Sequence, residues 1–83
     1  MELFGTPDTS GKFRPEDSVG RLSETTLYLS ASEMLSLAEF FAKCAREAQE
    51  FELWDHEHFA DFQWLRDHSY DGPDLIVHLA ERG

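Results

Sequence analysis

The sequence predicts an α+β fold in which one long helix packs across a small, mainly antiparallel sheet. A capped pattern of helical spacing runs from residue 30 to about residue 50, and runs of β-branched and aromatic residues lie on both sides of it. Because a lone helix must bury its apolar side against another element, packing on a sheet is the simplest arrangement. The expected order is strand, helix, strand, strand, and an extra N-terminal edge strand at Leu3-Phe4 is an option.

The first 21 residues differ in composition from the rest of the chain. Residues 5–21 predict a loop, because they are rich in residues that break helices and strands: Gly5, Pro7, Gly11, Pro15 and Gly20. We therefore separate an N-terminal segment, residues 1–21, from a single α+β domain, residues 22–83. The domain opens with a predicted strand at residues 25–29, for which an earlier start at Leu22 is also compatible.

The predicted helix has a well-defined start. Ser30 and Glu33 have the spacing of a capping box, in which each side chain accepts a hydrogen bond from the backbone amide of the other residue. No glycine or proline follows until Gly72. Apolar residues continue at helical spacing to about residue 50: Met34, Leu37, Ala38, Phe41, Ala45 and Ala48.

Two further strands are expected after the helix. Residues 56–62 alternate, which predicts a strand with one face formed by His56, His58, Ala60 and Phe62. Residues 63–73 are expected to form a long connection that includes a turn at Asp71-Gly72. The β-branched, apolar run at residues 75–79 predicts the last strand.

Length and charge narrow the classes of function. The chain has 83 residues, enough for one domain, and its 17 acidic residues against 7 Lys and Arg give a net charge of −10. This charge argues against nucleic acid and anionic membranes as partners, because both require a basic surface. With no apolar run long enough to span a membrane, no secretion signal and one cysteine, the chain is expected to be cytoplasmic. The negative charge either attracts a basic partner or only keeps the protein soluble.

The acidic residues concentrate in the second half of the chain. Between residues 47 and 65 there are six acidic residues and no Lys or Arg, and tryptophans occur at two positions. Carboxylates beside large aromatic side chains are typical of protein-binding surfaces. The alternative is a place in the core: Trp64 fits either role equally, whereas for Trp54 the core or a cover over the helix end is favoured. The predicted partner-binding residues are Glu50, Glu52, Trp54, Asp55, His56, Glu57, His58, Asp61 and Trp64.

Histidines provide an alternative, a metal site. His56 and His58 would point to the same side of a strand, and His78 on the last strand would supply a third nitrogen if the two strands pair. Histidines at this spacing also occur on solvated sheet faces without a metal, and we favour no metal or other cofactor. Cys44 is expected to be a buried structural thiol, because it lies within the helix rather than at a helix N-terminus.

The order of four motifs resembles a known family. TLYLS at residues 26–30, EMLSLAEFF at 33–41, HEHFAD at 56–61 and PDLIV at 73–77 resemble small bacterial immunity proteins of polymorphic toxin systems, and most closely the immunity protein 32 family. The resemblance covers about residues 22–80. It implies a cytoplasmic antidote, not an enzyme, that binds and blocks a cognate toxin. The matching residues are His56, Glu57, His58, Asp61, Pro73 and Asp74.

Three hypotheses therefore follow from the sequence. The first is an immunity-type protein that neutralises a basic toxin through its acidic face. The second is a small metal-binding protein that uses the strand histidines. The third is a structural subunit that forms a homodimer by pairing exposed sheet edges.

Overall fold

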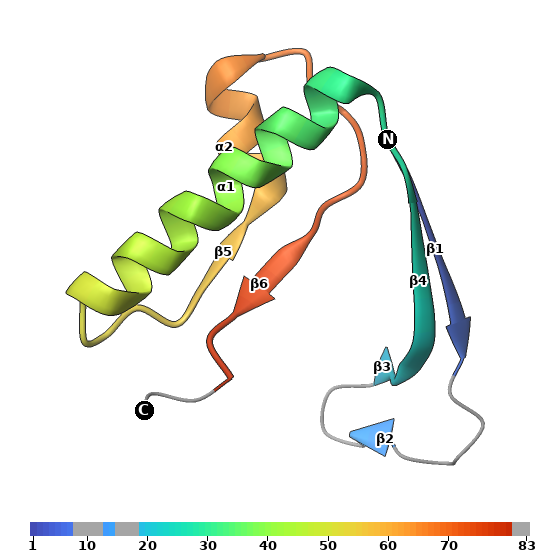
Figure 1. Ribbon diagram of the computed structural model, residues 1–83, viewed down its shortest axis with the longest axis horizontal. Coiled ribbons are helices and arrows are strands. Elements are labelled where there is room, and N and C mark those ends of the chain that lie inside the picture. The colour runs from blue at the N-terminus through green and yellow to red at the C-terminus, as the bar shows by residue number, and fades with distance from the viewer. Residues whose placement is uncertain (8–12, 15–18, 81–83) are drawn as a thin grey trace.

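A computed structural model of the chain describes residues 1–7, 13–14 and 19–80 (Figure 1). It confirms the α+β class and the long helix in the middle of the chain. The elements in chain order are β1 (Glu2–Pro7), β2 (Phe13–Arg14), β3 (Val19–Gly20), β4 (Leu22–Tyr28), α1 (Ala31–Glu50), β5 (His56–His58), α2 (Phe59–Arg66) and β6 (Ile76–His78).

The described strands form separate antiparallel pairs and not one sheet. β1 pairs with β4, β2 with β3, and β5 with β6. The optional N-terminal strand is present and is longer than Leu3-Phe4, because β1 pairs with β4 from Glu2 opposite Tyr28 to Pro7 opposite Leu22. The prediction of a loop over residues 5–21 is therefore wrong where β1, β2 and β3 occur. Residues 8–12 and 15–18 of that segment lie outside the described part.

The long helix begins as the sequence predicts. The Ser30 Oγ accepts a hydrogen bond from the Glu33 amide at 3.2 Å, and the Glu33 carboxylate accepts one from the Ser30 amide at 2.8 Å. Both halves of the capping box are therefore present and satisfy backbone donors at the helix start. The helix ends at Glu50, and the backbone is extended at the C-cap residue Phe51.

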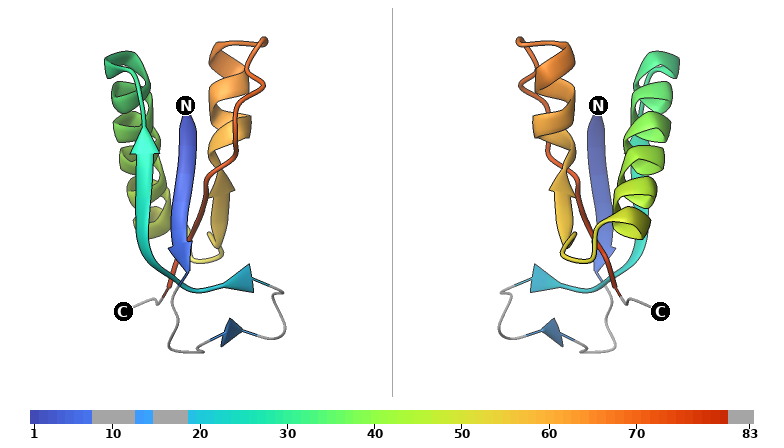
Figure 2. Two further views of the ribbon diagram at one scale, coloured as in Figure 1. Left: turned by 90° about the vertical axis from the view of Figure 1, so that its right-hand side faces the viewer. Right: turned by 90° about the vertical axis from the view of Figure 1, so that its left-hand side faces the viewer.

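The core lies between α1 and the elements that follow it. α1 packs over α2 and over the β5–β6 pair, which lie together on one side of it (Figures 1 and 2). Among the described residues, the buried apolar side chains are Leu37, Phe40 and Cys44 from α1 and Phe59 from α2, of which Phe40 and Phe59 are fully buried. The Phe40 ring lies 5.4 Å from the Phe59 ring, edge to face. Cys44 is buried, as predicted, and its burial raises the pKa of the thiol.

The prediction of a strand over residues 56–62 is wrong beyond His58. Residues from Phe59 to Arg66 form the helix α2, which also shortens the predicted connection at 63–73. In a strand Phe59 and Phe62 would point to opposite faces, whereas in α2 they share one side and both pack near Phe40. A short segment of alternating residues does not distinguish these two periods, and the tertiary contact with Phe40 favours the helix.

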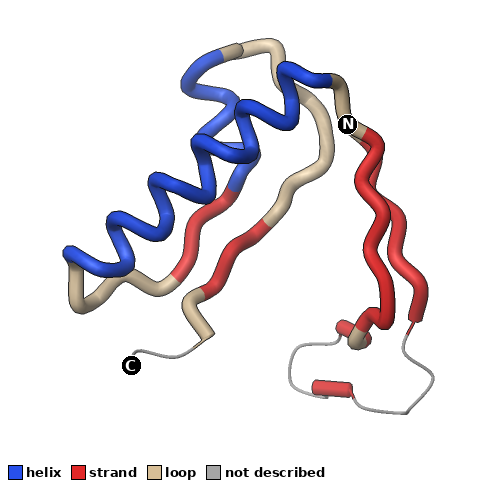
Figure 3. The backbone as a smooth tube through the Cα atoms, viewed as in Figure 1, coloured by secondary structure: helices blue, strands red, loops and turns tan. Residues whose placement is uncertain are grey.

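The β1–β4 hairpin lies beside this core and adds little to it. The two long strands lie apart from both helices (Figure 3). Only Met1 and Leu29, at the base of the hairpin, pack against the core cluster among the residues of this region that the structure describes. The hairpin exposes large apolar side chains, with Phe4 53% and Tyr28 62% accessible. A two-stranded hairpin with both faces open is of marginal stability alone.

Candidate binding surface and histidine cluster

The chain makes a tight turn where α1 ends. The Phe51 amide donates to the Glu47 carbonyl at 2.9 Å, and the Trp54 amide donates to the Phe51 carbonyl at 3.1 Å. This turn leaves Leu53 95% exposed and Phe51 57% exposed. Glu50 and Glu52 alternate with these two apolar residues and are also exposed. We call residues 50–53 the acidic end of α1.

Electrostatics make the acidic end unusual for a helix terminus. The C-terminal end of a helix carries a partial negative charge that basic residues normally offset, but the last turn of α1 contains none. Glu50 and Glu52 form no ion pair with any residue that the structure describes, whereas Glu47 and Glu57 both contact Lys43, at 3.1 and 3.4 Å. The negative potential of Glu50 and Glu52 is therefore directed to solvent.

The structure separates the predicted partner-binding residues into different places. Trp54 is partly buried against the core, so it serves as a cover. Asp61 and Trp64 lie on α2, beside the middle of α1 and away from the acidic end (Figure 1). Trp64 is 49% exposed and stacks on His68 with ring centroids 4.3 Å apart. A partner that covers the acidic end does not need to reach α2.

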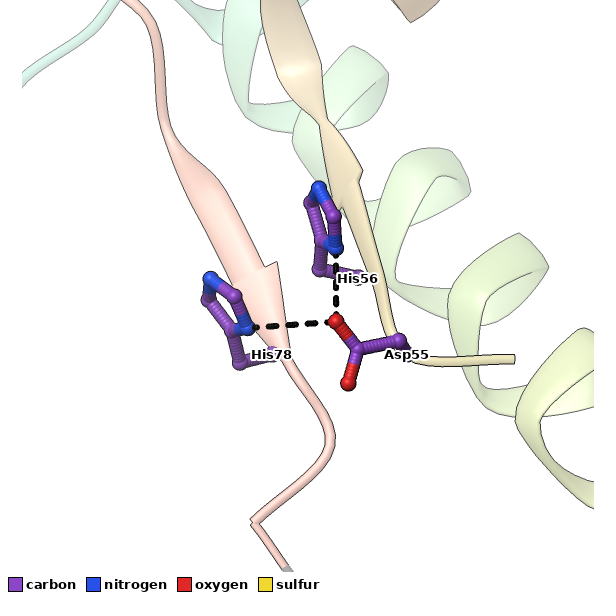
Figure 4. Close-up of side chains that lie close together, drawn as sticks. All are labelled: Asp55, His56 and His78. Carbon is purple, nitrogen blue, oxygen red and sulfur yellow. Dashed lines mark hydrogen bonds and ion pairs between the residues drawn. The ribbon is translucent and has the colours of Figure 1, made fainter. Parts of the chain in front are cut away.

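Asp55, His56 and His78 form a cluster on the β5–β6 pair (Figure 4). The His56 Nδ1 lies 2.8 Å from the Asp55 Oδ2, and the His78 Nδ1 lies 3.9 Å from the same oxygen. The two imidazole rings are stacked, with centroids 4.8 Å apart and an interplanar angle of 18°. All three residues are exposed.

His58 is engaged elsewhere. Its Nδ1 lies 2.6 Å from the Asp74 Oδ2, and the Asp74 Oδ1 accepts a hydrogen bond from the Ala60 amide at 2.8 Å. The hydrogen bond with Asp74 raises the pKa of His58. For Asp74, desolvation raises the pKa, but the hydrogen bonds from Ala60 and His58 outweigh it and leave the pKa below its usual value. Asp74 thus stabilises the start of α2, where the N-cap residue His58 provides no side-chain cap.

Sequence reasoning missed Phe51 and Leu53 as surface residues. Both are apolar and follow directly on the helical pattern, and neither is among the predicted helix, strand or partner-binding residues. The available signal was that Glu50 and Glu52 flank Phe51 and that Glu52 precedes Leu53, because carboxylates are hard to bury. The role of Asp74 was also missed, since nothing in the local sequence places it opposite Ala60.

Comparison with known proteins finds no family model, curated protein or solved structure that matches the chain. Neither helix in the described part of the chain has the length and apolar character needed to cross a membrane.

Proposed function

We propose that this chain is an immunity-type protein that binds and neutralises a basic toxin protein, with the acidic end of α1 as a central part of its binding surface. The observation that carries the proposal is the exposure of Phe51 and Leu53 next to Glu50 and Glu52, two carboxylates that have no ion-pair partner in the described residues. Exposed apolar anchors surrounded by charge are typical of protein-binding surfaces. The protein has no enzymatic role in this proposal.

Charge indicates the chemistry of the partner. With a net charge of −10 and a helix C-terminus without basic residues, the surface attracts cationic proteins over roughly 8–10 Å at moderate ionic strength. A basic partner would place Lys or Arg against Glu50 and Glu52 and an apolar patch against Leu53. The resemblance of motifs over residues 22–80 to immunity proteins agrees with a toxin as this partner.

The test is capture by affinity-tagged protein from the organism that encodes it, followed by identification of the captured protein by mass. We expect a basic protein in equimolar amount, bound at low salt and released at high salt. Its expression should arrest growth of a bacterial host, and co-expression of this chain should restore growth.

Matched variants make the test specific to the acidic end. The triple variant Glu50→Gln/Glu52→Gln/Leu53→Ser should lose capture and growth rescue, and exposure of these side chains means that it should still fold. The control Asp67→Asn/Asp71→Asn/Leu65→Ser removes the same charge and an apolar side chain that is 73% exposed, from elsewhere on the surface. Equal capture by both variants, or a captured protein without effect on growth, would contradict the proposal.

A second candidate function is a homodimeric subunit, favoured by the exposed hairpin. Among the described strands, β1 and β4 pair only with each other, and they leave Phe4 53% and Tyr28 62% exposed. A second copy that pairs edge to edge with this hairpin would extend the two strands into a four-stranded sheet, with Phe4 and Tyr28 together on one face of it.

Mass measurement tests the homodimer directly. Light scattering at high protein concentration should give twice the chain mass, and Tyr28→Glu should give the monomer while the control Leu65→Glu stays dimeric. A monomeric mass for the unaltered protein at every concentration would exclude this candidate and leave the toxin-binding proposal unaffected.

A further inference from the structure

Pairing of β5 with β6 places two histidines directly opposite each other. His56 faces His78 in the register of the two strands. The Leu79 amide donates to the Asp55 carbonyl at 2.9 Å, and the Phe59 amide donates to the Leu75 carbonyl at 2.8 Å. Hydrogen-bonded pairs alternate with non-hydrogen-bonded pairs in an antiparallel ladder, so His56 and His78 form a non-hydrogen-bonded pair, in which side chains lie closest.

The same pairing brings a carboxylate to the two rings. Asp55 precedes His56 in the chain, and the hydrogen bond from Leu79 to its carbonyl fixes its backbone beside β6. The Asp55 Oδ2 points to a ring nitrogen of each histidine (Figure 4). The potential ligand atoms of the three residues all lie within 4.8 Å of one another.

We propose that Asp55, His56 and His78 bind a divalent first-row transition-metal ion such as Zn²⁺. Imidazole nitrogens select such ions over Mg²⁺ and Ca²⁺, which prefer oxygen ligands. Around a tetrahedral ion with bonds of about 2.0–2.1 Å, neighbouring ligand atoms lie about 3.3 Å apart. The distances of 2.8 and 3.9 Å to the Asp55 Oδ2 lie on either side of this value, and all three ligand atoms lie within 4.8 Å of one another, so rotation of these exposed side chains would bring them to it.

The surroundings agree with a metal ion at this position. The three side chains are exposed, so they lose little hydration when they bind, and water or a ligand from another molecule completes the coordination. His58 lies outside the group of three whose ligand atoms come within 4.8 Å of one another, and its Nδ1 is 2.6 Å from the Asp74 Oδ2. An ion at the cluster would join β5 to β6, two three-residue strands that pair only with each other in the described part of the chain. Binding should therefore stabilise the fold.

The experiment is calorimetric titration of ZnCl₂ into protein that has been freed of metal and carries no histidine tag. We expect one equivalent of Zn²⁺ to bind, no comparable binding of Ca²⁺, and affinity at least about tenfold weaker in His78→Ala and Asp55→Asn. His68→Ala is the matched control, because His68 is exposed and stacks on Trp64 away from the cluster. It should bind Zn²⁺ with unchanged affinity.

Thermal denaturation provides an independent readout. Zn²⁺ should raise the midpoint for the unaltered protein and for His68→Ala, and should raise the midpoint of His78→Ala less at the same Zn²⁺ concentration. Less than one equivalent bound, equal affinity in His78→Ala and the unaltered protein, or binding of Ca²⁺ as tight as that of Zn²⁺ would overturn the proposal. The triple variant at residues 50–53 should keep Zn²⁺ binding, and so the toxin-binding and metal proposals can fail separately.

Discussion

Asp74 connects three parts of the fold, and its replacement by alanine measures how much that connection stabilises the protein. One carboxylate oxygen accepts a hydrogen bond from the Ala60 amide at 2.8 Å, in the first turn of α2. The other lies 2.6 Å from the His58 Nδ1 at the end of β5. The Asp74→Ala variant removes both interactions and leaves the start of α2 without a side-chain cap.

The expected cost follows from these two interactions. A side-chain cap contributes about 1 kcal/mol, and a hydrogen bond to a charged group contributes about 1.5–3 kcal/mol when it is buried. Because the Asp74 and His58 side chains are 34% and 38% exposed, the second contribution must be reduced for solvent screening. We expect the free energy of unfolding to fall by about 2 kcal/mol, which corresponds to a midpoint lower by about 8–16 °C for a domain of this size.

Urea and thermal denaturation at neutral pH measure this loss, with Asp71→Ala as the control for removal of an acidic residue nearby. The pKa of Asp74 is lowered in the folded state, so its contribution is fully present above the unfolded value of about 3.9 and is lost as the pH falls through the folded value. The difference between Asp74→Ala and the unaltered protein should therefore shrink below about pH 4. A loss of less than about 0.5 kcal/mol at neutral pH would refute the assigned role.

Other predictions concern the core and the helix start. Phe40→Ala should lower the free energy of unfolding by about 3–5 kcal/mol in urea, whereas Phe41→Ala, at a side chain 46% exposed, should cost far less; similar losses would contradict the assigned core. The pKa of Glu33 is lowered from 4.5 to about 2, first by the Met1 amino group and then by the Ser30 amide. Glu33→Gln should thus destabilise the protein at neutral pH, and its thermal midpoint should approach that of the unaltered protein as the pH falls toward 2. Cys44 should react with a thiol reagent only after unfolding, because its thiol is buried and has a raised pKa; fast labelling of the folded protein would contradict this.

Local patterns predicted α1 and its start well. The capping box at Ser30 and Glu33 and the apolar spacing to residue 48 are properties of one continuous segment, so nearby residues determine them. The strands at 22–28 and 76–78 were also predictable, because β-branched and aromatic residues occur together at 25–28 and β-branched residues at 76–77.

Long-range contacts explain what the sequence did not show. The change from strand to helix at Phe59 depends on Phe40, nineteen positions earlier, and on Asp74, fourteen positions after Ala60. The separation of the strands into pairs also depends on tertiary packing, since nothing in the sequences of β1 and β4 specifies that these two strands pair only with each other.

In the candidate sites, too, local sequence patterns predicted some features, and others depend on long-range contacts. The spacing of His56 and His58 predicted that both lie on one side of a strand. His78 was expected to supply a third nitrogen if the last two strands pair. Pairing of β5 with β6 brings His78 beside His56, and Asp74 engages His58. The sequence shows the acidic stretch as a run of carboxylates. Only the structure around the end of α1 shows that Glu50 and Glu52 face solvent, whereas Glu57 contacts Lys43.

The most direct test of the binding proposal is the association rate of the captured basic protein with this chain as a function of salt. We expect the rate to fall at least about tenfold between low and high salt, because attraction to the acidic end accelerates encounter. Glu50→Gln/Glu52→Gln should bind more slowly at low salt and should depend less on salt, and Asp67→Asn/Asp71→Asn should behave like the unaltered protein. A rate independent of salt, or the same salt dependence in both variants, would contradict the assignment of the acidic end as the binding surface.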